Sequence, residues 1–344
     1  MATAAAETTS ALRALLLMLI APAFGVALGV LLLVAVLLPR MPMGATQRIV
    51  ELGRHLALPP APGPRIVFIG NSIVRDGIDA QIVADAASGD WHAENLALSG
   101  CGLNERRILL PRLLASRPDV VAIGLSGTEV CRLDALAPDK AYVYAHAGFV
   151  SAWPTGRTAA DFPGMAPGSY AALRSSAPEQ WVHFRTVPAN WLEHGLRLAL
   201  RSDLRSGYES DWIRPFTRTA SIAGPRLARH LDEIEKGLGA CASVPWEQGD
   251  SVLTALLEDV TTGEATPLLL LLPVHPDLRS SAAPVRARLH TLAVELGRQH
   301  SAALVDASDL LGADGFADAV HPNQAGREAL SHLVANALPV REAR

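Results

Sequence analysis

Three residue types that cooperate in nucleophilic catalysis occur in two short stretches near opposite ends of the folded part of the sequence. Ser72 lies at a turn in RIVFIGNSIVRDGI (65–78), directly after an apolar run. Asp318 and His321 lie three residues apart in DAVHPN (318–323), a spacing at which one turn can present both side chains to a single point. A serine hydroxyl is a weak nucleophile that needs a base and a group to orient that base. The spacing predicts that Ser72 attacks, that His321 accepts its proton and that Asp318 orients His321.

Each of these residues also has a purely structural interpretation. A serine after a strand is often a helix N-cap, and a histidine before Pro322 could simply precede a helix that begins with that proline. We favour catalysis for Ser72 and His321 because the two stretches occur together and are accompanied by two further loops, LSGCG (98–102) and SGTE (126–129).

Strands and helices must alternate to bring these loops together. Five short apolar runs read as strands, and they cover 65–70, 93–98, 119–125, 267–272 and 302–306. Helical spacing follows or separates them at 78–87, 104–116, 252–260, 282–300 and 322–337. Such alternation predicts a parallel sheet covered by helices on both faces. In such a sheet a site lies beyond the carboxyl ends of the strands, where Ser72 and both loops are placed.

Four blocks in this order resemble the SGNH (GDSL-type) esterase superfamily. The blocks are GNS with Ser72, NLALSG with Gly100, GTE with Thr128, and DAVHPN. The resemblance implies a flavodoxin-like three-layer α/β/α sandwich with a five-stranded parallel sheet and a catalytic triad of Ser72, His321 and Asp318. It also implies an oxyanion site made by Ser72, Gly100 and Thr128, although Thr128 is as well explained as a cap.

The blocks depart from the family pattern at two positions. Asn71 replaces the usual aspartate of the first block, and Thr128 replaces the asparagine whose amide helps to bind the oxyanion. A threonine hydroxyl can still donate one hydrogen bond, on a shorter arm. Losing one such donor typically costs about 10²- to 10³-fold in rate, so a slow enzyme is compatible with this change and an inactive one is not required. We expect Asn71 and His275, which follows the fourth strand, to be the substrate-binding positions, with a structural role for His275 as the alternative.

Composition limits the partners and suggests a membrane anchor. A net charge of −4 makes nucleic acid an unsuitable partner. Residues 14–39 form 26 positions without a charge, long enough for the roughly 20 residues that a bilayer core requires. We therefore expect a cytoplasmic tail at 1–13, a single-pass transmembrane helix at 14–39 and a proline-rich linker at 40–64. The catalytic domain is then 65–131 with 251–344, interrupted by an inserted lid at 132–250.

The branch of the superfamily that the chain most resembles consists of membrane-tethered proteins that acylate or deacylate cell-envelope polymers, the DltD-like proteins among them. This resemblance implies an acylated glycan or lipid-linked substrate, a membrane-bound acyltransferase partner and a periplasmic or extracytoplasmic catalytic domain. Flanking arginines favour the opposite orientation weakly, and we give the resemblance more weight.

The insertion at 132–250 is rich in aromatic residues. It holds all four tyrosines and five of the six tryptophans. We interpret most of these rings as the core of the lid, with enough left over to stack on a sugar or to enclose an acyl chain.

Three functions follow from these observations. The first is a serine esterase or O-acyltransferase that acts on acylated envelope glycans through an acyl-enzyme. A lipase or thioesterase with the same triad and a noncatalytic assembly protein are the alternatives. No nucleotide or other cofactor is implied, and no metal, because Cys101, Cys131 and Cys241 lack zinc-ligand spacing. In an oxidising compartment we expect Cys101 to pair with Cys131, leaving Cys241 alone.

Overall fold

The computed structural model describes residues 44–131, 133, 136–176, 179 and 222–339, together with scattered positions between 20 and 32. The run at 14–39 that we expect to be a membrane anchor lies largely outside the described residues, as does most of 177–221 in the insertion. In the part that the structure describes, no helix has both the length and the apolar character needed to cross a bilayer.

Five parallel strands form one sheet in the order β2-β1-β3-β4-β5. The strands are β1 (Arg65–Ile69), β2 (His92–Asn95), β3 (Val120–Leu125), β4 (Thr266–Leu271) and β5 (Ala303–Asp306). Each of them overlaps one of the five apolar runs. The strand order reverses between β1 and β3, which pair directly although β2 lies between them in sequence. This is the flavodoxin-like order, so the predicted five-stranded parallel sheet is confirmed.

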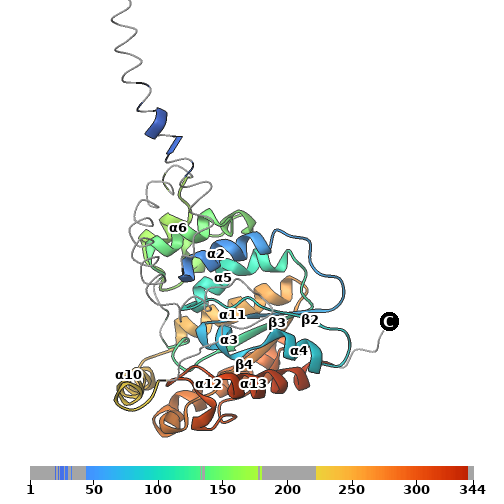
Figure 1. Ribbon diagram of the computed structural model, residues 1–344, viewed down its shortest axis with the longest axis vertical. Coiled ribbons are helices and arrows are strands. Elements are labelled where there is room, and N and C mark those ends of the chain that lie inside the picture. The colour runs from blue at the N-terminus through green and yellow to red at the C-terminus, as the bar shows by residue number, and fades with distance from the viewer. Residues whose placement is uncertain are drawn as a thin grey trace, which may run out of the picture.

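Helices cover both faces of the sheet and complete the predicted three-layer sandwich (Figure 1). One face carries α3 (Ser72–Gly77), α4 (Ala80–Ala86) and α13 (Gln324–Ala337), and the other carries α2 (Gly44–His55), α5 (Leu103–Leu114), α11 (Glu247–Thr262) and α12 (Arg279–His300). Side chains along a strand alternate between the two faces. Ile66 and Phe68 of β1 pack towards the first group, whereas Val67 and Ile69 pack towards the second.

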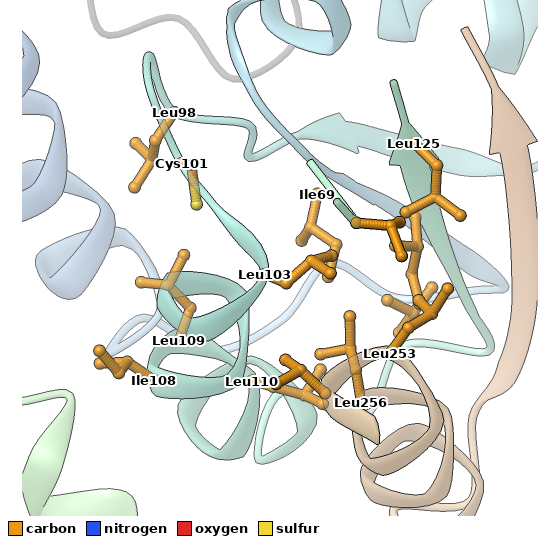
Figure 2. Packing of buried hydrophobic residues seen from close by; sticks show 14 of the residues in the cluster. Ile69, Leu98, Cys101, Leu103, Ile108, Leu109, Leu110, Leu125, Leu253 and Leu256 are labelled. Carbon is orange, nitrogen blue, oxygen red and sulfur yellow. The ribbon is translucent and has the colours of Figure 1, made fainter. Parts of the chain in front are cut away.

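The larger core lies between the sheet and the helices α5 and α11. Figure 2 shows Leu110 of α5 beside Leu253 and Leu256 of α11, with Ile69 of β1 above them. All four side chains are at most 2% exposed. Burying a leucine or isoleucine fully stabilises the fold by about 1.5–3 kcal/mol, so this layer holds the sheet and its helices together.

The segment after β1 forms two short helices where the sequence predicts a single one at 78–87. Helix α3 begins at Ser72 and α4 begins at Ala80. Asn71 and Asp79 are the two N-caps, and the side-chain oxygen of each accepts hydrogen bonds from N–H groups in the helix that follows it. These caps satisfy donors that every helix start leaves unpaired, which allows the chain to end one helix and begin another at once.

Aromatic side chains in the described part of the insertion are buried in the larger core, whereas Trp181, Trp191, Tyr208 and Trp212 lie outside the described residues. This part contains α6 (Pro138–His146), the 3₁₀ turns η3 (Val150–Ala152) and η4 (Ala159–Asp161), α7 (Pro167–Leu173) and α10 (Pro225–Ala242). Tyr144, Phe149 and Phe162 are at most 1% exposed. Trp153 stacks on Phe162 with ring centroids 5.0 Å apart. These rings are therefore structural and do not line the site described below.

Helix α2 lies in the segment that we expected to be a linker, 40–64. Its residues Ile49 and Leu52 are 1% exposed and belong to the larger core. Arg48 donates hydrogen bonds from Nη2 to the carbonyl oxygen of Asn95 (3.1 Å) and from Nε to that of Ala97 (3.3 Å). The folded domain thus extends at least one helix closer to the N-terminus than Arg65.

Candidate active site

Ser72 is positioned by the sharp turn that joins β1 to α3. The turn passes through Gly70, where an added Cβ would collide with the side chain of Val74. Asn71 caps α3, because its Oδ1 accepts a hydrogen bond from the backbone N–H of Ile73 (2.9 Å). Ser72 is therefore the first residue of a capped helix, and its backbone is fixed at the carboxyl end of β1, an internal strand of the sheet.

Asp318 and His321 are held together by the loop that connects β5 to α13. One carboxylate oxygen of Asp318 accepts hydrogen bonds from the backbone N–H groups of Val320 and His321, each 2.9 Å long. Nδ1 of the His321 ring lies 2.9 Å from both carboxylate oxygens of Asp318. The Asp318 side chain thus fixes both the loop and the orientation of the imidazole.

The electrostatics of Asp318 suit an orienting carboxylate. Burial by itself would raise its pKa, but hydrogen bonds from the His321 ring and from the two backbone N–H groups outweigh burial and hold that pKa well below its usual range. Asp318 is 3% exposed and His321 8% exposed. The carboxylate stays ionised at neutral pH and keeps Nδ1 of His321 as the donor, so Nε2 is the ring nitrogen that accepts a proton.

The structure brings Ser72 to the other side of this ring. Ser72 Oγ lies 2.8 Å from Nε2 of His321, although the two residues are 249 positions apart in the sequence. Serine, histidine and aspartate therefore form one continuous chain of hydrogen bonds. Such a chain allows His321 to remove the proton from the serine hydroxyl as it attacks, and then to pass the proton to a leaving group.

The other predicted site residues line one cavity together with Ser72. The cavity has a volume of about 250 Å³, and its lining includes Asn71, Gly100, Thr128 and His275. Gly100 has a left-handed backbone conformation with φ of +58°, which a residue with a side chain adopts only at a cost. Its carbonyl accepts a hydrogen bond from Nζ of Lys140 (2.9 Å), so the loop after β2 is anchored on the insertion.

His275 has a clear structural role besides its place in the cavity lining. Its Nδ1 accepts a hydrogen bond from the backbone N–H of Asp277 (3.3 Å) and thereby caps the turn η7 (Pro276–Leu278). The ring packs on Phe316 with centroids 5.0 Å apart. Burial lowers the pKa of His275, so the ring is neutral and its Nε2 carries the proton.

Two features of the site were not predicted from the sequence. Glu129 and the fully buried Arg106 of α5 form an ion pair beneath the loop after β3. Burial raises the pKa of the Glu129 carboxyl, and the Arg106 guanidinium opposes that rise.

The second feature is the carboxylate of Asp76, which is 1% exposed. Its Oδ2 lies 4.0 Å from Nε2 of His321, and its Oδ1 accepts a hydrogen bond from Arg75 (2.6 Å). The spacing of four residues between Ser72 and Asp76 on one helix is the signal that could have identified this carboxylate.

The predicted pairing of Cys101 with Cys131 is wrong. Cys131 forms a disulfide with Cys241, with the two Cα atoms 5.4 Å apart. Cys101 is a free thiol at 1% exposure, and burial raises its pKa to about 12. Figure 2 shows Cys101 among the leucines above α5, where the packing of the loop holds it in the core. The side chain points into the protein interior, so it is unavailable to Cys131 at the rim.

No known protein-family profile and no curated protein sequence matches the chain. Solved structures with a similar arrangement include a proposed acylhydrolase from Bacteroides fragilis, with 12% identity and a TM-score of 0.39 over 85% of this chain and 94% of the other. An acetylxylan esterase from Geobacillus stearothermophilus has 11% identity and a TM-score of 0.41 over 83% and 99%. An acetyl xylan esterase from Butyrivibrio proteoclasticus has 11% identity and a TM-score of 0.30 over 80% and 64%. The functional assignment below rests on the site geometry.

Proposed function

We propose that the chain is a serine ester hydrolase or O-acyltransferase with a triad of Ser72, His321 and Asp318. The observation that carries the proposal is the continuous chain of hydrogen bonds from Ser72 Oγ through the His321 ring to the Asp318 carboxylate. The opening of this chain into a cavity supports it further, because a nucleophile needs space for its substrate.

The first half-reaction transfers the acyl group to the enzyme. Ser72 Oγ attacks the carbonyl carbon of the ester while its proton passes to Nε2 of His321. The backbone N–H groups of Ser72 and Gly100 and the hydroxyl of Thr128 are the proposed donors to the oxyanion. Collapse of the tetrahedral intermediate breaks the ester C–O bond, and the departing alcohol takes the proton from His321. The acyl group remains on Ser72.

The second half-reaction releases the acyl group. Water or the hydroxyl of an acceptor gives a proton to His321 as it attacks the acyl carbon, and Ser72 leaves with that proton. Hydrolysis and transfer therefore share the acyl-enzyme and differ only in the attacking hydroxyl. Intact-mass measurement after incubation with candidate acyl donors identifies the donor, and addition of oligosaccharide acceptors then measures how the acyl group partitions between water and acceptor.

Hydrolysis of p-nitrophenyl esters and labelling by a fluorophosphonate probe test the triad. Ser72→Ala and His321→Ala should each reduce kcat at least about 10³-fold with the fold intact, because the members of a triad act as a unit. Ser72→Ala should also abolish labelling. His290→Ala is the matched control, since the exposed His290 lies 3.9 Å from Asp306 on the surface and makes a similar contact away from the cavity. Wild-type activity in Ser72→Ala would refute the proposal.

We further propose that the domain is tethered to the membrane by 14–39, faces away from the cytoplasm and acts on acylated envelope glycans or lipid-linked substrates. The resemblance to envelope acyl-transfer proteins supports this placement, as does the Cys131–Cys241 disulfide, because disulfides persist in oxidising compartments. Alkaline phosphatase fused after Arg344 should be active. Green fluorescent protein fused at the same position should not fluoresce, because it would be exported unfolded. The reverse pattern would place the domain in the cytoplasm.

A further inference from the structure

Helix α10 presents an apolar stripe to the rest of the domain. Leu231, Ile234, Leu238 and Cys241 recur at spacings of three and four residues, which places them on one face of the helix. Leu231 and Ile234 are partly buried against the larger core, whereas Leu238 and Cys241 are within it. Figure 1 shows α10 beside α12 at the edge of the sandwich.

Two residues of this stripe form a wall of the cavity that contains Ser72. Ile234 and Leu238 line the cavity, and Leu278 of η7 continues the wall. Leu238 is 6% exposed and Leu278 3% exposed. Leu238 also lies over the loop after β3, since a Cβ built on Gly127 would be 3.8 Å from Leu238 Cδ2. The wall is therefore apolar and stands next to Thr128.

The cavity lining also includes polar groups, among them those of Asn71, Ser72 and Gly100. Among the described residues that line the cavity, Glu129 carries the only carboxylate, and its two oxygens are already used by Arg106 and by the backbone N–H of Ser126. A sugar ring placed against the wall would bury hydroxyl groups without partners, at a cost, whereas an alkyl chain there would leave none unpaired.

We infer that this wall is an acyl-binding subsite for short aliphatic acyl groups, of about butyryl to hexanoyl length, in the ester substrate. The inference rests on the proposed function, because the acyl carbon must be attached to Ser72 while its chain contacts Leu238. The volume of about 250 Å³ lies below the ~300–1,000 Å³ usual for drug-sized ligands, so the cavity suits a short chain rather than a long lipid chain. Each methylene that the wall buries should raise kcat/KM about fourfold.

The disulfide fixes where the wall stands. Cys241 follows Leu238 by one turn of α10, and its partner Cys131 follows Thr128 by three residues in the loop after β3. The cross-link therefore ties the apolar wall directly to the loop that carries a proposed oxyanion donor.

The chain-length profile of kcat/KM tests the inference, with p-nitrophenyl acetate, butyrate, hexanoate and decanoate as substrates. The wild-type protein should prefer butyrate or hexanoate. Leu238→Ala should reduce kcat/KM for hexanoate about tenfold and leave acetate within about twofold. Leu238→Phe, which narrows the cavity, should shift the preference to acetate.

Leu231→Ala is the matched control, because Leu231 belongs to the same stripe but is absent from the cavity lining. It should lower thermal stability about as much as Leu238→Ala without changing the profile. If the wild-type protein and all three variants hydrolyse esters and are labelled at Ser72 but share one chain-length profile, the subsite is overturned and the proposed function stands. Absence of turnover and labelling in the wild-type protein would overturn the proposed function, and the subsite with it.

Discussion

Arg106 and Glu129 form a buried ion pair that joins the two loops of the candidate active site. The Arg106 side chain is fully buried, and its Nη2 contacts both Oε1 of Glu129 and the carbonyl oxygen of Cys101 in the loop after β2. Its Nη1 donates to the carbonyl oxygen of Gly124 at the end of β3 (2.8 Å). A single guanidinium thus sets the distance between the loop that contains Gly100 and the loop that contains Thr128.

Breaking the Arg106–Glu129 ion pair should lower both the free energy of unfolding and kcat. Arg106→Met leaves a carboxylate buried without its partner, which should cost about 3–5 kcal/mol of the free energy of unfolding in urea. The double variant Arg106→Met with Glu129→Leu should recover much of that stability while kcat remains low, because the loops are no longer tied together. Lys236→Met removes the exposed pair with Asp232 and is the control that should change neither quantity. Full recovery of kcat in the double variant would contradict the role of the Arg106–Glu129 pair in positioning the two loops.

Gly100→Ala should reduce kcat by an effect on the backbone. An added Cβ at Gly100 meets no atom within 4 Å, so the penalty comes from the φ of +58°, roughly 1–2 kcal/mol for an alanine. Relief of that strain would turn the Gly100 N–H away from its present direction. Gly156→Ala is matched, since Gly156 also has a positive φ (+90°) and open space around it but lies outside the cavity lining. Both variants should lose similar stability, and kcat for p-nitrophenyl butyrate should fall only for Gly100→Ala.

The stability of the domain at low pH should depend on Glu94. Its carboxylate lies 2.6 Å from Nη2 of Arg65 and 2.7 Å from Nε2 of His55. Burial alone would raise its pKa, but these two partners outweigh burial and lower that pKa from 4.5 to about 2. A lowered carboxylate pKa contributes stability above the unfolded-state value of 4.5, and that stability is lost as the pH falls towards about 2.

Glu94→Gln should therefore be less stable by about 2 kcal/mol at pH 7, allowing for partial screening by solvent, and should lose stability less steeply between pH 4.5 and 2. Urea unfolding across this pH range measures both effects. Glu295→Gln, at an exposed position of α12, is the control that should follow the wild-type curve. Parallel curves for Glu94→Gln and the wild-type protein would exclude this contribution.

The disulfide should make a measurable contribution to stability. Cys131 and Cys241 are 110 positions apart, and disulfides typically stabilise a fold by about 2–4 kcal/mol. Cys241→Ser should lower the melting temperature, and reduction of the wild-type protein should lower it equally.

Alkylation without a reductant distinguishes the three cysteines. The native protein should take up no reagent, because Cys101 is buried and burial raises its pKa to about 12. The denatured protein should take up one equivalent, at Cys101. Modification of Cys131 or Cys241 under these conditions would show that the pair is not cross-linked.

Local patterns determined the sheet and the backbone of the site. Strands β1, β3 and β4 are mostly apolar, because a strand buried on both faces needs apolar side chains along most of its length, and that requirement is visible in the sequence itself. The turns after β1, β2 and β3 carry Ser72, Gly100 and Thr128. Asp318 and His321 meet because they are three positions apart in one turn, so their contact is also local.

Tertiary packing decided what the patterns left open. Arg106 pairs with Glu129 only because α5 crosses under the loop after β3, and nothing in the sequence between these two residues, which are 23 positions apart, signals that crossing. The same holds for Cys131 and Cys241, which α10 brings together when its apolar stripe packs on α12. Cys101 is nearer to Cys131 in sequence but is turned into the core. The periodicity of a helix or strand fixes which side chains are buried, whereas the partner that each one meets depends on how distant elements pack, and a single sequence does not specify that locally.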